Sequence, residues 1–106
     1  MSYMFGYCNN LRSIYLSNFD TRKVVDMSSL FCFCSDLEKI NLSNFITSQT
    51  ENMSGMFFFC SKLIEVDISN FEFDESTNVG EMFFGNPENI KINSGNKKLP
   101  KKAFEM

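Results

Sequence analysis

The sequence predicts an α/β fold, a solenoid of about four coils with a short parallel sheet on one face and short helical or 3-10 turns on the other. Three observations support this prediction. The chain repeats at one fixed interval, each unit contains a segment typical of a strand, and each contains a segment typical of a single helical turn. A unit this small buries its apolar face only by stacking on its neighbours, so we expect equivalent side chains to touch.

The repeat is defined by residue types that recur at a fixed spacing. Met1, Met27 and Met53 begin three copies, and each copy continues to a Ser-Asn-Phe triplet, as at residues 43–45. We therefore expect coils at residues 1–26, 27–52 and 53–78, with a degenerate fourth at residues 79–93.

Two segments of each unit have opposite periodicities. In "LEKINLSN" the apolar residues occupy the first, fourth and sixth places, which favours a short strand. In "MSSLF" they fall at i, i+3 and i+4, one face of a helical turn, and Asp26 and Asn52 stand before such turns as candidate N-caps.

Stacking predicts ladders of like residues. Phe and Cys columns are expected to face the core, with the thiols reduced, because parallel Cα vectors suit disulfide geometry poorly. An Asn column is expected to tie successive coils at the strand ends. These ladders are Phe5, Phe31, Phe57 and Phe83; Cys8, Cys34 and Cys60; and Asn18, Asn44 and Asn70. Cys32 lies outside the thiol column, and we expect it to face partly outward.

Composition excludes several functions. The chain contains no His, which removes Ser-His-Asp and Cys-His catalysis, and its thiols lack the paired CxxC spacing of zinc sites. We expect no enzyme, metal or cofactor. Residues 1–93 hold six Lys or Arg against twelve acids, which argues against nucleic-acid binding. No apolar run approaches the ~20 residues of a membrane span, and the start lacks the features of a signal peptide.

The end of the chain differs in charge from the rest. Residues 94–106 hold four Lys against one acid. This segment is interpreted as a basic C-terminal tail or as the start of a further, truncated unit, and such a charge run is expected to be solvated.

The unit "MSSLFCFCSDLEKINLSNFITSQTEN" resembles the BspA-like leucine-rich repeats, in the subgroup reading Met-Ser-x-Met-Phe-x-x-Cys-x-x-Leu in bacterial and protist surface proteins. The resemblance covers residues 1 to about 93. It implies a parallel-stranded leucine-rich-repeat solenoid, a role in adhesion or binding, and a cell-surface or secreted location. The chain departs from the pattern at residues 72–81 and at Asn86, which stands where Cys is usual.

The sequence thus predicts a non-enzymatic protein-interaction or adhesion module that binds a protein or host-surface ligand on its exposed strand face. The candidate binding residues are Tyr15, Asn41, Asp67, Arg12, Lys39 and Glu65. One alternative is a structural spacer or truncated repeat fragment without a ligand, and another is a thiol redox protein using Cys32 and Cys34. Nothing in the chain precedes the apolar Met4 and Phe5 to cover them, which predicts self-association or further repeats at the N-terminal end.

Overall fold

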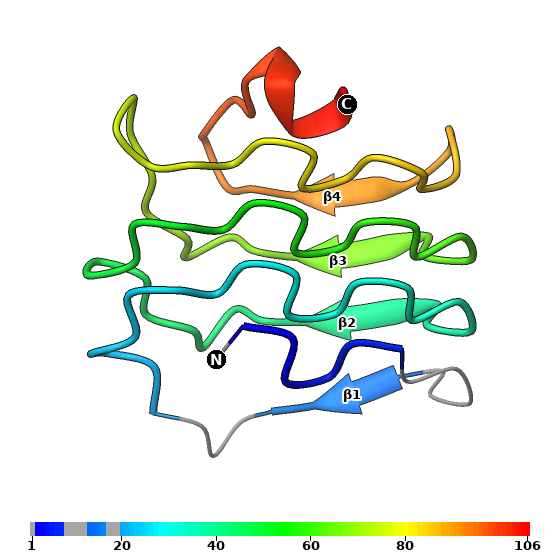
Figure 1. The fold of residues 1–106 in the computed structure, drawn as a ribbon, viewed down its shortest axis with the longest axis horizontal. Helices are drawn as coiled ribbons and strands as arrows, with labels where there is room; N and C mark the ends of the chain where they lie inside the picture. The colour runs from blue at the N-terminus through cyan, green and yellow to red at the C-terminus, as the bar shows by residue number, and fades with distance from the viewer. Residues whose placement is uncertain (1, 8–12, 17–19) are drawn as a thin grey trace.

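A computed structural model describes residues 2–7, 13–16 and 20–106. It is a small α/β domain whose strands all run parallel in one four-stranded sheet, with the order β1-β2-β3-β4 (Figure 1). The strands are β1 (Ser13–Tyr15), β2 (Lys39–Asn41), β3 (Glu65–Asp67) and β4 (Lys91–Asn93). The predicted parallel sheet is therefore confirmed.

The register of the sheet follows the interval of the sequence repeat without a slip. Ile40 of β2 lies opposite Ile14 in β1 and Val66 in β3, and Val66 lies opposite Ile92 in β4. The side chains of Ile40 and Val66 are buried, while Lys39 and its counterparts on the neighbouring strands β3 and β4 are exposed. The alternation follows from the pleat, which points successive side chains to opposite faces.

A second set of backbone hydrogen bonds joins the repeats through four turn segments, residues 2–7, 28–33, 54–59 and 80–85. In the second of these segments, the N–H groups of Ser29, Phe31 and Phe33 donate to carbonyl oxygens of the next repeat at 2.8 to 2.9 Å. Their acceptors are Ser54, Met56 and Phe58, which all belong to the third turn segment. Each repeat is thus bonded to the next at two places.

The predicted helical turns are not helices, and this expectation was wrong. The N–H groups of Cys32 and Cys34 donate within the segment, to Ser29 and Phe31, but the alternate N–H groups are used between repeats. An α-helix uses successive N–H groups for hydrogen bonds within itself, so a helix cannot extend through this segment. Ser29 and Phe33 also have positive φ values of 55° and 58°, which end a right-handed helix. Among the described residues, the one helix is the 3-10 helix η1 (Lys101–Phe104).

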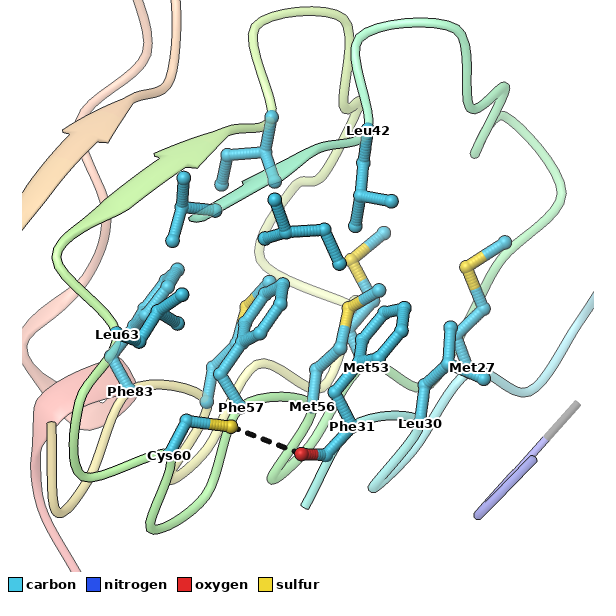
Figure 2. Close-up of a cluster of buried hydrophobic side chains, with 14 of the residues drawn as sticks. Met27, Leu30, Phe31, Leu42, Met53, Met56, Phe57, Cys60, Leu63 and Phe83 are labelled. Carbon is cyan, nitrogen blue, oxygen red and sulfur yellow. Dashed lines mark hydrogen bonds between the residues drawn. The ribbon is translucent and has the colours of Figure 1, made fainter. Parts of the chain in front are cut away.

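Buried phenylalanine rings form a continuous column between the turn segments and the sheet. The ring of Phe31 stacks on Phe5 at 5.4 Å and on Phe57 at 5.6 Å, and Phe57 stacks on Phe83 at 5.2 Å. Figure 2 shows Phe31 and Phe57 projecting from their turn segments toward the side chain of Leu42, which follows β2. Phe31, Phe57 and Leu42 have no exposed surface.

The thiols of the Cys column are buried donors. The Sγ of Cys34 donates to the carbonyl oxygen of Phe5 at 2.9 Å, and that of Cys60 to Phe31 at 3.0 Å (Figure 2). Both side chains are fully buried. Cys8, the first member of the expected column, lies outside the described residues.

Polar side chains also connect neighbouring repeats. The Nδ2 of Asn44 donates to the carbonyl oxygen of Leu16 at 3.2 Å, and the Nδ2 of Asn70 donates to that of Ser43. Asn18 lies outside the described residues. Thr47, which is 1% exposed, donates its hydroxyl to the Glu72 carbonyl and accepts the Glu72 N–H.

The C-terminal segment differs from the expected solvated tail. Helix η1 covers the end of the stack beyond β4 (Figure 1), and its residue Ala103 is fully buried. The N–H groups of Glu81 and Phe83 donate to the carbonyls of Lys102 and Ala103 at 2.8 and 2.7 Å, in the place of a further repeat. Burial of Ala103 and these two bonds offset the cost of ordering the segment, while Lys98, Lys101 and Lys102 remain exposed. The ring of Phe104 continues the aromatic column on Phe83 at 5.7 Å.

Candidate interaction surfaces

The exposed side of the sheet has a row of alternating charges. Lys39, Glu65 and Lys91 are aligned across β2, β3 and β4 by the strand register. The Nζ of Lys39 lies 3.7 Å from a carboxylate oxygen of Glu65, with about two thirds of the surface of each side chain exposed. An exposed pair of this kind contributes at most about 1 kcal/mol. Glu65 offsets one of the two lysine charges in the row.

The second row on this side consists of Asn and Asp side chains that accept hydrogen bonds at the ends of the strands. Side-chain oxygens of Asn41 and Asp67 accept the N–H groups of Ser43 and Ser69, both at 2.9 Å. Asn93 accepts the N–H of Gly95 at 3.1 Å in the same way. Asp26 and Asn52 make the equivalent bond before their turn segments, to Ser28 at 2.8 Å and Ser54 at 3.0 Å, although no helix follows. These bonds close local turns and give each Asn or Asp a structural role.

The sheet therefore brings four predicted binding residues together on neighbouring strands, namely Lys39, Asn41, Glu65 and Asp67. Tyr15 lies in β1, opposite Asn41. Arg12 lies outside the described residues.

A row of exposed aromatic rings on the turn segments was not predicted as a site. Tyr7 stacks on Phe33 at 5.0 Å with 6° between the ring planes, and Phe33 stacks on Phe59 at 5.5 Å and 9°. Their exposed fractions are 62%, 36% and 37%. The sequence contains a signal for this row, because the three aromatic residues recur at the interval of the repeat. The row was missed because the segment was expected to form a helical turn, which predicted no outward-facing row at that position.

A second aromatic row packs edge-on against the first. Phe58 stacks on Phe84 at 5.7 Å, and Phe58 meets Phe59 at 4.7 Å with an interplanar angle of 88°. We call the five rings of Tyr7, Phe33, Phe58, Phe59 and Phe84 the aromatic surface. Edge-to-face and offset contacts of this kind hold rings in fixed orientations.

The outer row ends where a glycine replaces the aromatic residue. Gly85 occupies the position of Phe59 one repeat later, and its φ of 83° suits glycine. A Cβ at Gly85 would lie 2.7 Å from Cδ1 of Phe59, so any side chain there would displace that ring. The row therefore spans the first three repeats.

Cys32 is more buried than expected, and the expectation of a partly outward thiol was wrong. Its side chain is 2% exposed, because Gly6 and Tyr3 pack closely beside it: a Cβ on Gly6 would be 3.3 Å from both Cys32 Sγ and the Tyr3 ring. Burial raises the pKa of the Cys32 thiol, and a hydrogen bond with Cys34 together with burial raises the pKa of Cys60. These thiols are thus protonated at neutral pH and poor nucleophiles.

Within residues 2–7, 13–16 and 20–106, no group of three or more His, Cys, Asp or Glu residues is arranged to hold a metal ion. The same residues contain no helix with the length and apolar character required to cross a membrane.

Residues 1–97 match the model of a protein family described as "Mycoplasma protein of unknown function, DUF285". The match covers most of the chain, including all four strands and the whole aromatic surface. No curated protein and no solved structure matches the chain.

Proposed function

We propose that the chain, which belongs to the DUF285 family of Mycoplasma proteins of unknown function, is a non-enzymatic protein-interaction or adhesion module. The observation that carries this proposal is the aromatic surface, in which Tyr7, Phe33 and Phe59 keep between about a third and two thirds of their area exposed. Contiguous exposed apolar surface on a small domain is typical of a binding site. Aromatic rings supply large contact area at low cost in conformational entropy.

The proposed architecture is a leucine-rich-repeat solenoid of about four coils, similar to the BspA-like repeats. The constant shift in the strand register and the hydrogen bonds between turn segments support it. The resemblance to that family also supports placement at the cell surface or outside the cell. Protease treatment of intact source cells tests the location, since a surface protein is digested while cytoplasmic controls survive.

Insertion of a second copy of residues 27–52 directly after Asn52 tests the architecture. A solenoid accepts the insert as one more layer, so its long dimension in small-angle scattering grows by about 4.8 Å, the spacing of adjacent strands. An insert of the same length and composition in scrambled order is the control. Disorder of the native insert, or growth equal to that of the scrambled insert, contradicts the architecture.

The aromatic surface fits the binding role better than the sheet face does. On the sheet face, Lys39 and Glu65 are paired and Asn41 and Asp67 accept backbone N–H groups. These polar groups already have protein partners, whereas Tyr7, Phe33 and Phe59 each keep about a third or more of their surface open to solvent. The sheet face remains the second candidate, because its residue types vary from repeat to repeat on a regular frame.

Selection from a random peptide library separates the two surfaces. Peptides selected on the wild-type protein are expected to lose binding to a Phe33→Asn, Phe59→Asn double variant, in which Asn tolerates the positive φ at both positions. The same peptides should keep binding to a Lys39→Ala, Glu65→Ala variant, which is the matched control. Loss on the second variant alone assigns binding to the sheet face, and retention on both variants places binding outside these two surfaces. Failure to select any peptide favours the structural spacer.

The N-terminal end is a separate candidate for contact between chains. Met4 is 53% exposed, whereas its equivalents Leu30, Met56 and Met82 are at most 1% exposed. We propose that a further repeat or a second copy covers Met4. Concentration-dependent sedimentation that a Met4→Lys substitution abolishes supports this, and a stable monomer at micromolar concentration argues against a second copy.

A further inference from the structure

A groove of about 350 Å³ runs along the aromatic surface in the direction of the stack. Tyr3 lines it in the first repeat and Glu81 in the fourth, with Ser29 and Gly55 between them in the second and third. The rings of Phe33 and Phe58 also line it, and these two rings meet edge-on at 5.6 Å with an angle of 79°. The groove thus crosses four repeats and has aromatic walls.

The groove exists because one column of the repeat changes in size along the stack. Tyr3, Ser29, Gly55 and Glu81 are equivalent positions, and all have φ between 55° and 62°. The small Ser29 and Gly55 leave space between the two large residues. A Cβ on Gly55 would lie 3.4 Å from Oγ of Ser29 and 3.7 Å from Cβ of Phe58, which shows how closely these residues surround the groove floor.

The charge of the groove has one sign. Glu81 is the one ionised group among the described residues that line it, and this carboxylate is exposed. The carbonyl of Lys102 accepts the Glu81 N–H, but Lys102 lines a different hollow together with Asp74 and Glu75. The groove therefore combines aromatic side chains with a negative charge that forms no ion pair among the described residues.

We propose that this groove binds an arginine side chain presented by an extended partner peptide. A cation is attracted to the electron-rich faces of aromatic rings, and Glu81 supplies the counter-charge. Arginine fits better than lysine because its planar guanidinium stacks on rings and offers paired donors to a carboxylate. A trough lined by residues of four successive repeats suits an extended peptide. The inference rests on the proposed function, since it names the class of partner that the aromatic surface recognises.

The probe is the peptide acetyl-Gly-Ser-Arg-Ser-Gly-amide, titrated into ¹⁵N-labelled protein and followed by NMR. We expect saturable shifts of the Gly55 and Gly80 amides, both of which belong to residues lining the groove. A peptide with citrulline in place of arginine has nearly the same shape without the charge, and it should bind about tenfold more weakly. A lysine peptide should fall between the two. Equal binding of the arginine and citrulline peptides overturns the proposal.

Two substitutions locate the site. Glu81→Gln removes the charge and should weaken binding of the arginine peptide about two- to fivefold, because Glu81 is exposed. Ser29→Tyr fills the groove with a residue that the chain already carries at the equivalent Tyr3 with the same sign of φ, and should abolish binding. Glu88→Gln removes an exposed acid that does not line the groove and should leave binding unchanged. The NMR spectrum of each variant reports whether it is folded.

The outcomes separate this inference from the proposed function. If the arginine peptide fails to bind, or binds Ser29→Tyr as well as wild type, the groove assignment is wrong. The module itself still stands if library peptides depend on Phe33 and Phe59. If neither the arginine peptide nor any library peptide depends on the aromatic surface, both proposals fall.

Discussion

The side-chain Nδ2 of Asn86 donates to the carbonyl oxygen of Phe57 at 2.8 Å. One repeat earlier, the Cys60 thiol makes the equivalent bond to the Phe31 carbonyl at 3.0 Å. Asn86 also reaches the Cys60 carbonyl at 3.2 Å, and its buried Oδ1 has no hydrogen-bond partner among the described residues. The departure from the Cys column therefore keeps the bond between repeats but adds an unsatisfied acceptor.

Substitution of Asn86 tests this exchange of one donor for another. Asn86→Ala removes two hydrogen bonds and should lower the free energy of unfolding by about 1 to 3 kcal/mol. Asn86→Cys restores the column and removes the unpaired oxygen, so it should raise the free energy of unfolding by about 1 kcal/mol. Urea denaturation measures both variants. A destabilised Asn86→Cys variant would show that the thiol is not equivalent to the amide.

The aromatic column includes two of the largest fully buried side chains, Phe31 and Phe57. Phe31 has no exposed surface and stacks on rings from both neighbouring repeats, so Phe31→Ala should cost about 3 to 5 kcal/mol. Phe59→Ala is the control, because this ring also lies on a turn segment but is 37% exposed. Its loss should lower the free energy of unfolding by about half as much or less. Thermal and urea unfolding compare the two, and equal losses would contradict the column as the centre of the core.

Buried threonines tie the repeats at a third place. Thr47 donates to the Glu72 carbonyl at 3.2 Å and accepts the Glu72 N–H at 2.7 Å. Thr47→Val keeps the shape and removes both bonds, so the free energy of unfolding should fall by about 1 to 3 kcal/mol. Thr47→Ser keeps the hydroxyl and should lower the free energy of unfolding less. Hydrogen exchange of the Glu72 amide should quicken in the valine variant and stay slow in the serine variant.

The pKa of the Asp20 carboxyl is lowered chiefly by one neighbour, Arg22. Hydrogen bonds from Arg22, at 3.0 Å from Nε and 2.8 Å from the terminal nitrogen, lower the pKa of Asp20 from 3.8 to about 2. The pKa of Asp20 is lower in the folded state than in the unfolded state. The pair's contribution to the stability of the fold is therefore complete above the unfolded-state pKa of about 3.9 and is lost as the pH falls toward 2.

Carboxyl ¹³C NMR measures the Asp20 titration directly. Arg22→Gln should return the pKa of Asp20 toward 3.8, and molar salt should raise it partly, because the pair is exposed. Lys23→Gln is the control with the same change in net charge, and it should have a smaller effect. An unchanged pKa of Asp20 in Arg22→Gln would show that the bidentate pair is absent in solution.

The reactivity of the thiols decides the redox alternative. Burial raises the pKa of the Cys32 thiol, so its thiolate is scarce until the pH rises well above neutrality. A maleimide at neutral pH should therefore label Cys32, Cys34 and Cys60 slowly in the native protein and rapidly in urea. The experiment uses a Cys8→Ser background with the sites resolved by mass spectrometry. Rapid native labelling of Cys32 would revive the thiol redox function.

The spacing of like residues determined much of this fold before any coordinates. A regular repeat with "LEKINLSN"-type segments indicated where the strands lie, because only a constant shift lets Ile40 and Val66 bury the same face. It also predicted the contacts of Phe31 with Phe5 and Phe57, since equivalent residues in stacked units must meet. These relationships are periodic, and periodicity is visible in a sequence.

Some features depend on which partner obtains a given backbone N–H group, and the tertiary structure alone decided these. The pattern of "MSSLF" is helical, but hydrogen bonds to the next repeat take the alternate N–H groups that a helix would need. That choice turned Phe33 outward, buried Cys32 and opened the groove beside Gly55. Likewise, the sequence did not predict η1 in the lysine-rich segment. This helix is stabilised by hydrogen bonds from N–H groups of the last repeat rather than by its own sequence. Local patterns specify what a segment prefers alone, and only its neighbours determine which donors and faces remain available.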